Sequence, residues 1–459
     1  MGRIFSLLLL VIVGLGVGRA QSTTTVFVPL VQTPPPTVAG YLGGAQNDTL
    51  VGVSITSTGE LVLAGNLPSL AGVPEVVLLG GGAGAFIQIG ADGRSISRVI
   101  RVAATLNHAA FGGGGAAVGC GPNGVVVLDA DLTTVRWAAT PGEVVRCAIA
   151  LDGRVAALLT TQTLLIYPAN GGSPLAVNVG GTAVRDIAID ATTGLVFATG
   201  YTQAASDLKV AFLRAYRLHD GTLAWQRYGF SAGVVKGAGL AADSEGRRLA
   251  MGGDGMLYVA GFTDGGNSIF GRDPADINRV LSTSELIKYD SYNNPFNISG
   301  AKSLAWYGRF DPASGTLLRG QWLLTRLSDG KGNSISIQGL AAAADGTLAV
   351  VGSAACCLQG RSTMQLFGQT LGSYESGEPF VLIVHPAFTQ RYVWTALAAP
   401  GATAGSSPAI AAAITADRIA VAVNFTPAGS RALVTTGYPV FATGLGGTDG
   451  YYVTMPWGR

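Results

Sequence analysis

Charge and metal-binding side chains are both scarce in this sequence. Of its 459 residues 12% are charged, and the 29 basic and 27 acidic residues give a net charge of +2. No run of lysine or arginine occurs, so the basic surface with which proteins hold nucleic acids is missing. Three histidines and four cysteines leave few ligands for transition metals. We therefore expect no nucleic-acid partner, no bound metal and no cofactor.

Long hydrophobic runs are absent after the N-terminus. Residues 1–20 place Arg3 before the apolar stretch 5–17 and end in Gly18-Arg19-Ala20, with small residues at the two positions that signal peptidase recognises. The apolar stretch is shorter than the roughly 20 residues that a membrane span needs. Residues 1–20 are therefore predicted to be a secretory signal peptide. We expect the mature chain to be soluble and extracellular or periplasmic, with attachment to the cell surface left open.

Signatures of common enzymes are missing as well. The sequence contains no Gly-x-Ser-x-Gly, His-Glu-x-x-His or phosphate-binding loop. His108, His219 and His385 are far apart in the chain, and none has metal-ligand spacing. The 67 glycines and 20 prolines follow no Gly-X-Y period, which excludes collagen. Their scatter between short apolar runs predicts many turns that join short β-strands.

Two kinds of hairpin alternate along the chain. The first joins a strand of small apolar residues to a strongly β-prone strand, and it occurs at 53–65, 147–158, 186–200, 239–261, 339–352 and 409–421. The second carries Arg, Trp and Tyr, and it occurs at 86–102, 212–229, 304–324 and 380–397. A propeller blade needs this gradient, because strands near a central axis are crowded and outer strands have room. We therefore predict an all-β propeller of four-stranded antiparallel blades.

The number of blades follows from the inner strands. Seven are expected, near Val53, Leu106, Ala148, Ile187, Leu240, Leu340 and Ile410. Six or eight blades stay open, because 116–128 also fits the pattern. Since the chain supplies about three strands after Ile410, the N-terminal strand at 23–29 is predicted to complete the last blade. The expected domains are a strand and Pro-rich connector at 21–40 and a propeller at 41–459, with insertions at about 264–303 and 353–379.

The start of the first unit resembles a known family. Tyr41-Leu42-Gly43-Gly44 is followed by Asn47-Asp48 and by a hairpin that ends in Leu63-Ala64-Gly65-Asn66. The pattern is similar to the bacterial beta-propeller repeat of secreted and surface proteins (SBBP-like), although Ser57 stands where that repeat usually has Asp. This resemblance implies a seven-bladed propeller and an exported location, and it brings no catalytic residues.

Cysteines and glycosylation triplets add candidate modifications. Cys120 and Cys147 can form a disulfide if their strands lie side by side. The adjacent Cys356 and Cys357 fit either a strained vicinal disulfide or two buried thiols. The acceptor triplets for N-glycosylation begin at Asn47, Asn297 and Asn424.

Insertions on a repeat scaffold are common binding devices, so the insertion at 264–303 is the candidate binding segment. Asp273-Pro274 is expected to open a short helix there. Its candidate binding residues are Asp273, Glu285, Lys288, Asp290 and Asn293. A solvated loop without a ligand is the alternative.

These observations predict an exported, non-catalytic propeller that acts as a binding module or surface scaffold. Its expected partners are a protein or glycan at the cell surface, or further copies of the same chain. Two enzyme classes remain as alternatives. Asp220–Trp225 resembles a hairpin of quinone-dependent dehydrogenases, in which Cys356-Cys357 would form a ring over the cofactor. A carbohydrate-active enzyme would need paired carboxylates, for which Asp186 and Asp243 are candidates.

Overall fold

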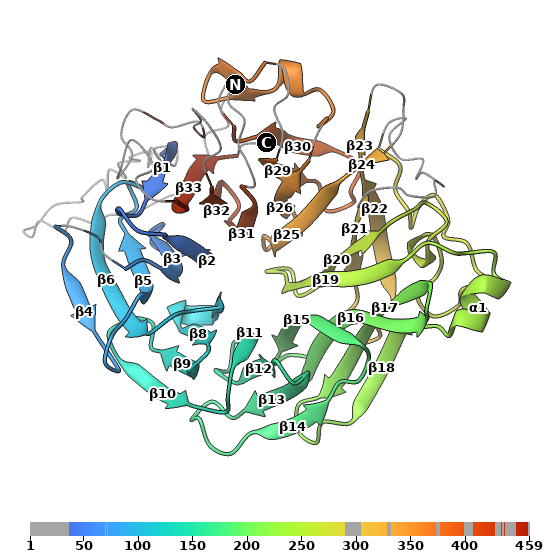
Figure 1. Cartoon of the computed structure of the whole chain (residues 1–459), viewed down its shortest axis with the longest axis horizontal. Coiled ribbons are helices and arrows are strands. Elements are labelled where there is room, and N and C mark those ends of the chain that lie inside the picture. Colours follow the sequence, from blue (N-terminus) through green and yellow to red (C-terminus); the bar gives the residue numbers. More distant parts are fainter. Residues whose placement is uncertain are drawn as a thin grey trace, which may run out of the picture. The chain divides into compact units, whose positions relative to one another are not determined.

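The computed structural model describes residues 36–68, 70, 72–289, 304–327, 332–355, 357–372, 377–398, 407–426, 433, 436 and 447–457. Contacts divide the chain into two units, Met1–Pro35 and Pro36–Arg459, and all described residues belong to the second. The main sheets of this unit are seven blades arranged in a ring around a central axis (Figure 1). The prediction of a seven-bladed all-β propeller is confirmed.

The strands of each blade are named here in order from the axis outward. Blade 1 contains β2 (Thr49–Ile55), β3 (Leu61–Asn66), β5 (Gly84–Ile89) and β6 (Ile96–Ala103), and β4 (Glu75–Val77) pairs in parallel with β6 at its outer edge. Blade 2 contains β7 (His108–Phe111), β8 (Ala117–Gly121), β9 (Gly124–Leu128) and β10 (Val135–Ala139). Blade 3 contains β11 (Val144–Ile149), β12 (Val155–Leu159), β13 (Thr163–Tyr167) and β14 (Leu175–Asn178). Blade 4 contains β15 (Ala183–Asp190), β16 (Leu195–Ala205), β17 (Leu208–Arg217) and β18 (Leu223–Tyr228).

The remaining blades follow the same antiparallel plan. Blade 5 contains β19 (Ser244–Met251), β20 (Leu257–Thr263), β21 (Leu304–Phe310) and β22 (Leu317–Leu323). Blade 6 contains β25 (Ile335–Ala342), β26 (Leu348–Ala354), β29 (Glu378–Val384) and β30 (Arg391–Ala396). Blade 7 contains β31 (Ala409–Ile414), β32 (Arg418–Phe425), β33 (Asp449–Pro456) and, outermost, β1 (Val38–Leu42).

Short elements decorate this ring. Two small hairpins pair β23 (Thr325–Arg326) with β24 (Gly332–Asn333) and β27 (Gln365–Leu366) with β28 (Gln369–Thr370). Helical residues of the described chain are α1 (Ala232–Gly237) and 3-10 turns at Gly113–Gly115, Ile269–Gly271 and Arg361–Thr363. None of the helices in the described ranges is both long and apolar enough to span a membrane.

The ring is closed by a strand from the N-terminal side of the chain. β1 pairs antiparallel with β33, from Val38 opposite Thr454 to Leu42 opposite Gly450. Closure by an N-terminal strand was predicted, and it is confirmed. The closing strand expected from the sequence, 23–29, lies outside the described residues, and the observed strand comes from the segment that had been assigned to the connector and the start of the first unit.

Two inner strands were misplaced by the sequence analysis. The fifth was expected near Leu240, but β19 begins at Ser244. The first residues of β19, Ser-Glu-Gly-Arg-Arg, have the composition of a loop. They can form a strand because their charged side chains lie at the mouth of the channel. The second was expected near Leu106 and begins two residues later, at His108. Segment 116–128 supplies β8 and β9 of the same blade, so no eighth unit arises there.

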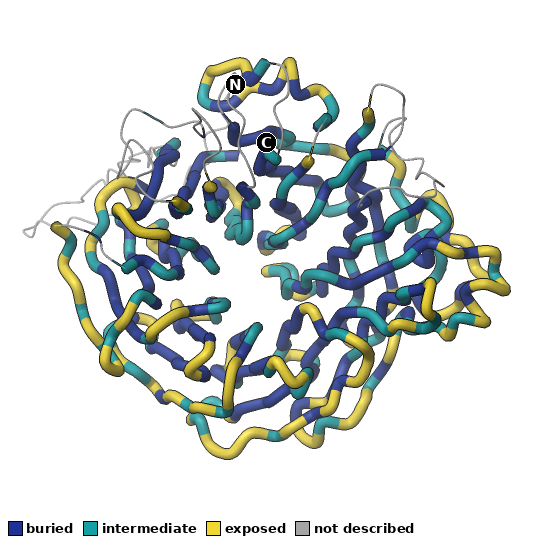
Figure 2. Tube along the Cα trace, in the orientation of Figure 1, coloured by how far each residue is buried: buried dark blue, intermediate teal, exposed yellow. Residues whose placement is uncertain are grey.

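Crowding near the axis explains the small residues of the inner strands. A Cβ atom on Gly339 of β25 would lie 3.0 Å from the Cα of Ala411 in β31. Larger side chains are placed farther out, and burial is greatest within the blades, whereas the turns and the outermost strands of blades 2 to 4 are exposed (Figure 2). The predicted size gradient from inner to outer strands is therefore present.

Tryptophans on outer strands join neighbouring blades. The indole nitrogen of Trp137 in β10 donates to the Ala169 carbonyl at 3.0 Å, and that of Trp225 in β18 donates to the Pro312 carbonyl at 3.1 Å. Gly171 and Gly315 lie beneath these indoles with φ values of 75° and 69°. A Cβ there would come within 2.4 Å and 2.8 Å of the rings, so both turns require glycine.

Two asparagines join neighbouring blades nearer the axis. Asn66, at the end of β3, accepts from the backbone nitrogen of Leu106 at 2.6 Å and donates to its carbonyl at 2.9 Å. Asn424 of β32 makes the same pair of bonds with Leu50 of blade 1, at 2.7 and 3.0 Å. Each amide thus satisfies both polar groups of one backbone residue in the next blade. Asn424 does this at the joint where the ring closes.

A buried carboxyl group also lies at this joint. Asp48 is fully buried; its Oδ2 accepts from the Gly44 nitrogen at 2.7 Å, and its Oδ1 has no hydrogen-bond partner. Burial is the main reason why the pKa of Asp48 rises to about 6, and the neighbouring Asp449 raises it further, although the Gly44 bond opposes the shift. Ionising Asp48 therefore costs folding free energy at neutral pH.

Removing the amide of Asn424 should weaken ring closure. Asn424→Ala leaves the buried N–H and C=O of Leu50 without these partners, and the expected loss in the free energy of unfolding is about 2 to 4 kcal/mol. Urea denaturation followed by fluorescence measures it. Asn170→Ala, in an exposed turn, is the control and should change stability by less than about 0.5 kcal/mol. Equal urea midpoints for the two variants would show that the hydrogen bonds between Asn424 and Leu50 contribute nothing to stability.

Asp48→Asn should stabilise the protein at alkaline pH. In the wild type the folded state binds the Asp48 proton up to pH near 6 and the unfolded state only to near 3.8, so the free energy of unfolding falls as pH rises through this window. The variant has no such loss and should be more stable than the wild type at pH 8 and similar at pH 4.5. Asp220→Asn is the control, because hydrogen bonds from Thr222 lower the pKa of Asp220 and its effect should have the opposite sign.

Candidate functional site

The central channel is a concave feature that every blade of the described propeller helps to form. Its cavity of about 550 Å³ is lined by the inner strands of all seven blades. Most of the lining consists of small apolar residues. The lining residues with charged side chains are Arg146 of β11, Asp186 of β15 and Arg248 of β19, which come from three consecutive blades.

A repeated backbone irregularity places these charges. The pairing register of six inner strands, β2, β11, β15, β19, β25 and β31, shifts by one residue near the start of the strand. The extra residues are Val51, Val145, Arg185, Arg247, Gln338 and Ile410. A β-bulge redirects the side chains at and beside it. Because the bulges occupy equivalent positions, these side chains gather at one end of the channel.

At blades 3 to 6 this end is polar. A second cavity of about 670 Å³ lies there. We call one set of polar residues at this end of the channel the arginine mouth: Arg146, Asp186, Arg185, Glu245, Arg247, Arg248 and Gln338. The exposed Glu143 also lines the second cavity, beside Asn107 and Gln162. Four guanidinium groups therefore meet three carboxylates in one region of a chain that carries little charge elsewhere.

Glu245 pairs with both outer arginines. It is buried, and its Oε1 accepts from Arg185 Nε at 2.6 Å and lies 3.7 Å from Arg247 Nε. Arg185 lies 5.4 Å from the centre of the Tyr201 ring, and Arg247 lies 4.4 Å from that of Phe262. Burial lowers the pKa of Arg247, while Glu245 opposes the shift. The outer part of the mouth thus combines guanidinium groups with aromatic faces.

Asp186 joins blades 4 and 5 at the inner part of the mouth. Its Oδ2 accepts from the Leu249 nitrogen of β19 at 3.0 Å, and its Oδ1 accepts from the Ile187 nitrogen at 3.0 Å. Arg146 Nε lies 3.5 Å from Oδ1. The Asp186 carboxylate is therefore occupied by backbone donors, and it neutralises Arg146 only through this longer contact.

Arg248 is fixed by neutral acceptors. Its Nε and terminal nitrogens donate to the Gln338 carbonyl at 2.7 Å, to Gln338 Oε1 at 2.6 Å and to the Arg247 carbonyl at 2.7 Å. No described carboxylate forms a hydrogen bond with it. Burial lowers its pKa to about 10, and the charge of Arg146 contributes to the shift, whereas Asp186 opposes it.

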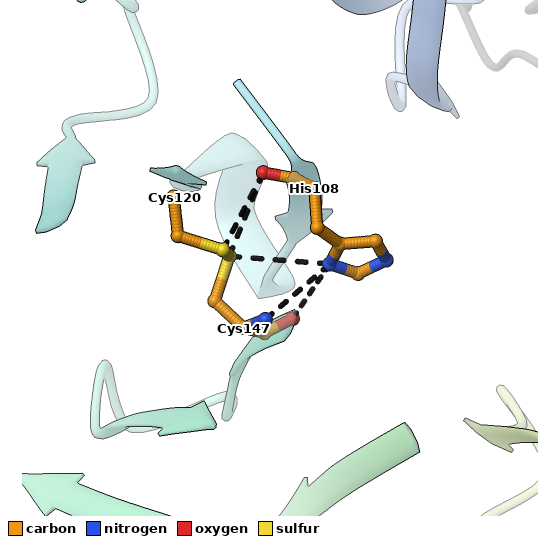
Figure 3. A group of neighbouring side chains, drawn as sticks. All are labelled: His108, Cys120 and Cys147. Carbon is orange, nitrogen blue, oxygen red and sulfur yellow. Dashed lines mark hydrogen bonds between the residues drawn. A yellow bond between two sulfur atoms is a disulfide. The ribbon is translucent and has the colours of Figure 1, made fainter. Parts of the chain in front are cut away.

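His108 lies on the channel wall beside a disulfide (Figure 3). Cys120 of blade 2 is bonded to Cys147 of blade 3, with Cα atoms 6.2 Å apart, so the predicted pairing is confirmed. The Nδ1 atom of His108 lies 3.0 Å from the Cys147 carbonyl, and Nε2 points away from the disulfide. Burial, then Arg146 and Arg248, holds the pKa of His108 well below its usual 6.5, so the ring is neutral at pH 7.

Residues His108, Cys120 and Cys147 also form a group whose ligand atoms lie within 4.8 Å of one another. Cysteine binds metals as a thiolate, and in this group both sulfurs are used in the disulfide. The group therefore does not fit a metal site in the oxidised protein. Its spacing of 108, 120 and 147 was not recognisable from the sequence, because it arises from the pairing of β7 with β8 and the packing of blade 3.

The residues predicted as a binding insertion form a network of their own. Arg279 bonds both Asp273 and Glu285, at 2.8 Å to Glu285 Oε1, and Ser282 donates to Glu285 Oε2. Hydrogen bonds from Arg279 lower the pKa of Glu285 to about 2. Lys288 is exposed, and Asp290 and Asn293 lie outside the described residues.

This insertion packs on blade 5. Phe270 stacks on Trp306 of β21 with ring centres 4.7 Å apart, and Ile277 and Leu281 are buried in the same cluster. The expected helix at Asp273-Pro274 is not formed; Asp273 instead caps a turn through the Ala275 nitrogen. The network joins this segment to itself, and its three charges largely cancel.

The other candidate modification sites have different surroundings. Asn47 is exposed and accepts from the Thr448 nitrogen at 3.1 Å, whereas the amide of Asn424 is bonded to the backbone of Leu50 in blade 1. Cys357 is part of a disulfide. Asn297 and Cys356 lie outside the described residues.

The residues weighed for catalysis serve as joints between strands. Asp243 Oδ1 accepts from the Lys209 nitrogen of β17 at 2.7 Å, and Asp186 binds β19 as described above. In the Asp220–Trp225 hairpin, Asp220 accepts from the Thr222 nitrogen at 2.9 Å, and Trp225 docks on blade 5. These contacts account for the four side chains by folding alone.

Comparisons with known proteins identify the fold. No family model and no curated protein matches the sequence. The chain is similar in structure to U3-55K, with a TM-score of 0.51 and 9% identity over 92% of this chain and 99% of that chain. A WD40 propeller domain of Doa1 (TM-score 0.45, 9% identity, 91% and 96% covered) and a chain of a mitotic checkpoint complex (0.46, 7%, 96% and 100%) also match. At such identities the likeness to U3-55K shows a β-propeller fold alone.

Loss of the Cys120–Cys147 disulfide should destabilise the joint of blades 2 and 3. The bond spans 27 residues, and the chain-entropy relation gives about 3.5 kcal/mol for a loop of this length. The double variant Cys120→Ala/Cys147→Ala should lose about this much in urea denaturation without reductant. In reductant the variant and the wild type should unfold at similar urea concentrations. A difference that persists under reducing conditions would assign the loss to packing instead.

Proposed function

We propose that the protein is an exported, non-catalytic β-propeller that binds an extracellular protein partner at the arginine mouth. The observation that carries this proposal is the alignment of the inner-strand bulges, which brings four arginines to one end of the channel. Bulges cost regular pairing, and they are common beside functional sites, where they redirect side chains.

The chemistry of the mouth favours binding over catalysis. Guanidinium groups stay protonated at physiological pH, so they hold anionic groups well and transfer protons poorly. The carboxylates of Glu245 and Asp186 are already bonded to an arginine and to backbone nitrogens, respectively. His108 is the one histidine that lines the described channel.

A protein partner fits the aromatic content of the mouth. Tyr201 lies between Arg185 and Lys209, and Phe262 lies under Arg247. Arginine and aromatic side chains dominate the binding energy of protein interfaces. A surface glycan or a second copy of the chain is the other expected occupant, and both are outcomes of the experiment below.

Export is supported by the sequence of residues 1–20 and by the disulfide. Disulfides persist in oxidising compartments and are rare in the cytosol, and Cys120–Cys147 joins two blades of the ring. We therefore place the mature chain outside the cytoplasm, beginning at Gln21, and its intact mass tests this assignment.

The binding proposal can be tested by crosslinking from each end of the channel. A benzophenone amino acid at position 201 should capture a partner from the cell surface or medium when the full chain is expressed. The same group in place of Leu151, which is 74% exposed in the turn at the opposite end of β11, should not. Arg185→Gln/Arg247→Gln should reduce capture, because it removes the outer guanidinium groups.

Arg136→Gln/Arg154→Gln is the matched control, since both side chains pair with exposed carboxylates in turns away from the mouth. Capture of a protein at position 201 that this control preserves supports the proposal. Adducts only between copies of the chain, only with glycan, or only from position 151 would overturn it.

A further inference from the structure

We propose that the channel wall beneath the arginine mouth is an oxyanion site, in which a phosphate or carboxylate group is held by Arg146 and Arg248. The inference rests on the proposed function and names the chemical group that the mouth admits. It is carried by the charge balance and the hydrogen bonds of two arginines from blades 3 and 5.

The channel carries an excess of positive charge. Two arginines and one carboxylate line it, and His108 is neutral. The Asp186 carboxylate is shared between two backbone nitrogens and the 3.5 Å contact with Arg146. At least one half-buried guanidinium charge is thus without a close counter-charge among the described residues. Such a charge is costly to bury unless an anion accompanies it.

Arg248 is the cation that lacks this counter-charge. All three of its hydrogen bonds run to neutral acceptors on Gln338 and Arg247. These bonds fix the plane of the guanidinium group, so no side-chain entropy is lost when an anion arrives. Three of its five N–H groups are used, and two donors are left over.

Arg146 supplies the second set of donors. Its Nε faces Asp186, and its two terminal nitrogens form no hydrogen bond with any described residue. The side chain is 22% exposed and lines both the channel and the outer cavity. Guanidinium nitrogens of this kind bind carboxylate or phosphate oxygens in pairs.

His108 lies beside the site on blade 2 and reports on it without donating to the anion. Its Nδ1 donates to the Cys147 carbonyl, so the disulfide-linked strands fix the neutral ring and Nε2 carries a lone pair. Its Nε2 points away from these strands, and the residue lines the channel. The cavity of about 550 Å³ is large enough for a small polyvalent anion.

Calorimetry on the mature full-length chain tests the site with defined probes. Sodium phosphate and sodium citrate should each be titrated against a sodium chloride background of matched ionic strength. We expect saturable binding of one anion per chain. Arg146→Gln should weaken it by about tenfold or more, because a charge-assisted pair of hydrogen bonds is lost. Arg136→Gln should leave it unchanged, and Arg146→Lys should retain part of it.

A second measurement needs no variant. The chain has three histidines, so imidazole signals of histidine-labelled protein can be assigned individually by NMR. Either anion should shift the His108 signals and leave those of His219 and His385 in place. Saturation by phosphate alone, by citrate alone or by both supports the oxyanion site and identifies its preferred group.

The inference is overturned if neither anion saturates, if Arg146→Gln binds as well as the wild type, or if His108 signals do not move. These outcomes are separate from the failure of the proposed function. Partner capture at position 201 without anion binding would refute the oxyanion site alone. Anion binding without capture would refute the protein partner alone.

Discussion

Closure of the ring is the constraint on which the rest of this structure depends. Blade 7 is complete only because its outermost strand comes from the N-terminal side of the chain, which holds both ends of the propeller in one sheet. Here β1 supplies five residues to β33, and Tyr41 within it packs edge-on against Phe425 and Tyr451. The two hydrogen bonds between the Asn424 amide and the Leu50 backbone then join blade 7 to blade 1. With the circumference fixed in this way, the inner strands must approach the axis at set positions.

That fixed geometry gives the bulges their effect. One bulge would redirect one side chain, but equivalent bulges around a closed ring direct several side chains to the same end of one channel. Blades 1 and 7 carry Val51 and Ile410 at the bulge, so their side of the mouth is apolar. Blades 4 to 6 carry Arg185, Arg247 and Gln338, so theirs is polar. The polarity of the site is thus set by a few positions on a shared backbone design.

Sequence patterns predicted the periodic part of the molecule and missed its exceptions. Hairpin turns and strand sizes follow from local rules, so they could be predicted directly, whereas the seven expected blades left six or eight open until the pairing of β8 and β9 placed segment 116–128 in blade 2. Ser244–Met251 was passed over because two adjacent arginines are unusual in a buried inner strand. Likewise, Asn424 matched a glycosylation triplet, whereas its role depends on Leu50, 374 positions away. Long-range contacts of this kind leave no local signal.

The half-buried charge of Arg248 is the feature of the mouth that an anion would complement. Arg361 is accompanied by Glu378 in blade 6, where Nη2 and Oε2 lie 3.0 Å apart, and the buried Arg418 is held by Thr454 and backbone carbonyls. Arg248 is also bonded to neutral groups, but it lines an open channel beside Arg146, and its pKa falls to about 10 as a result of burial and this neighbour. A fold that needed only a joint between blades 5 and 6 could use an uncharged amide, as Asn66 and Asn424 do elsewhere. Retaining a cation there is costly in free energy, and that cost is offset when an anion binds.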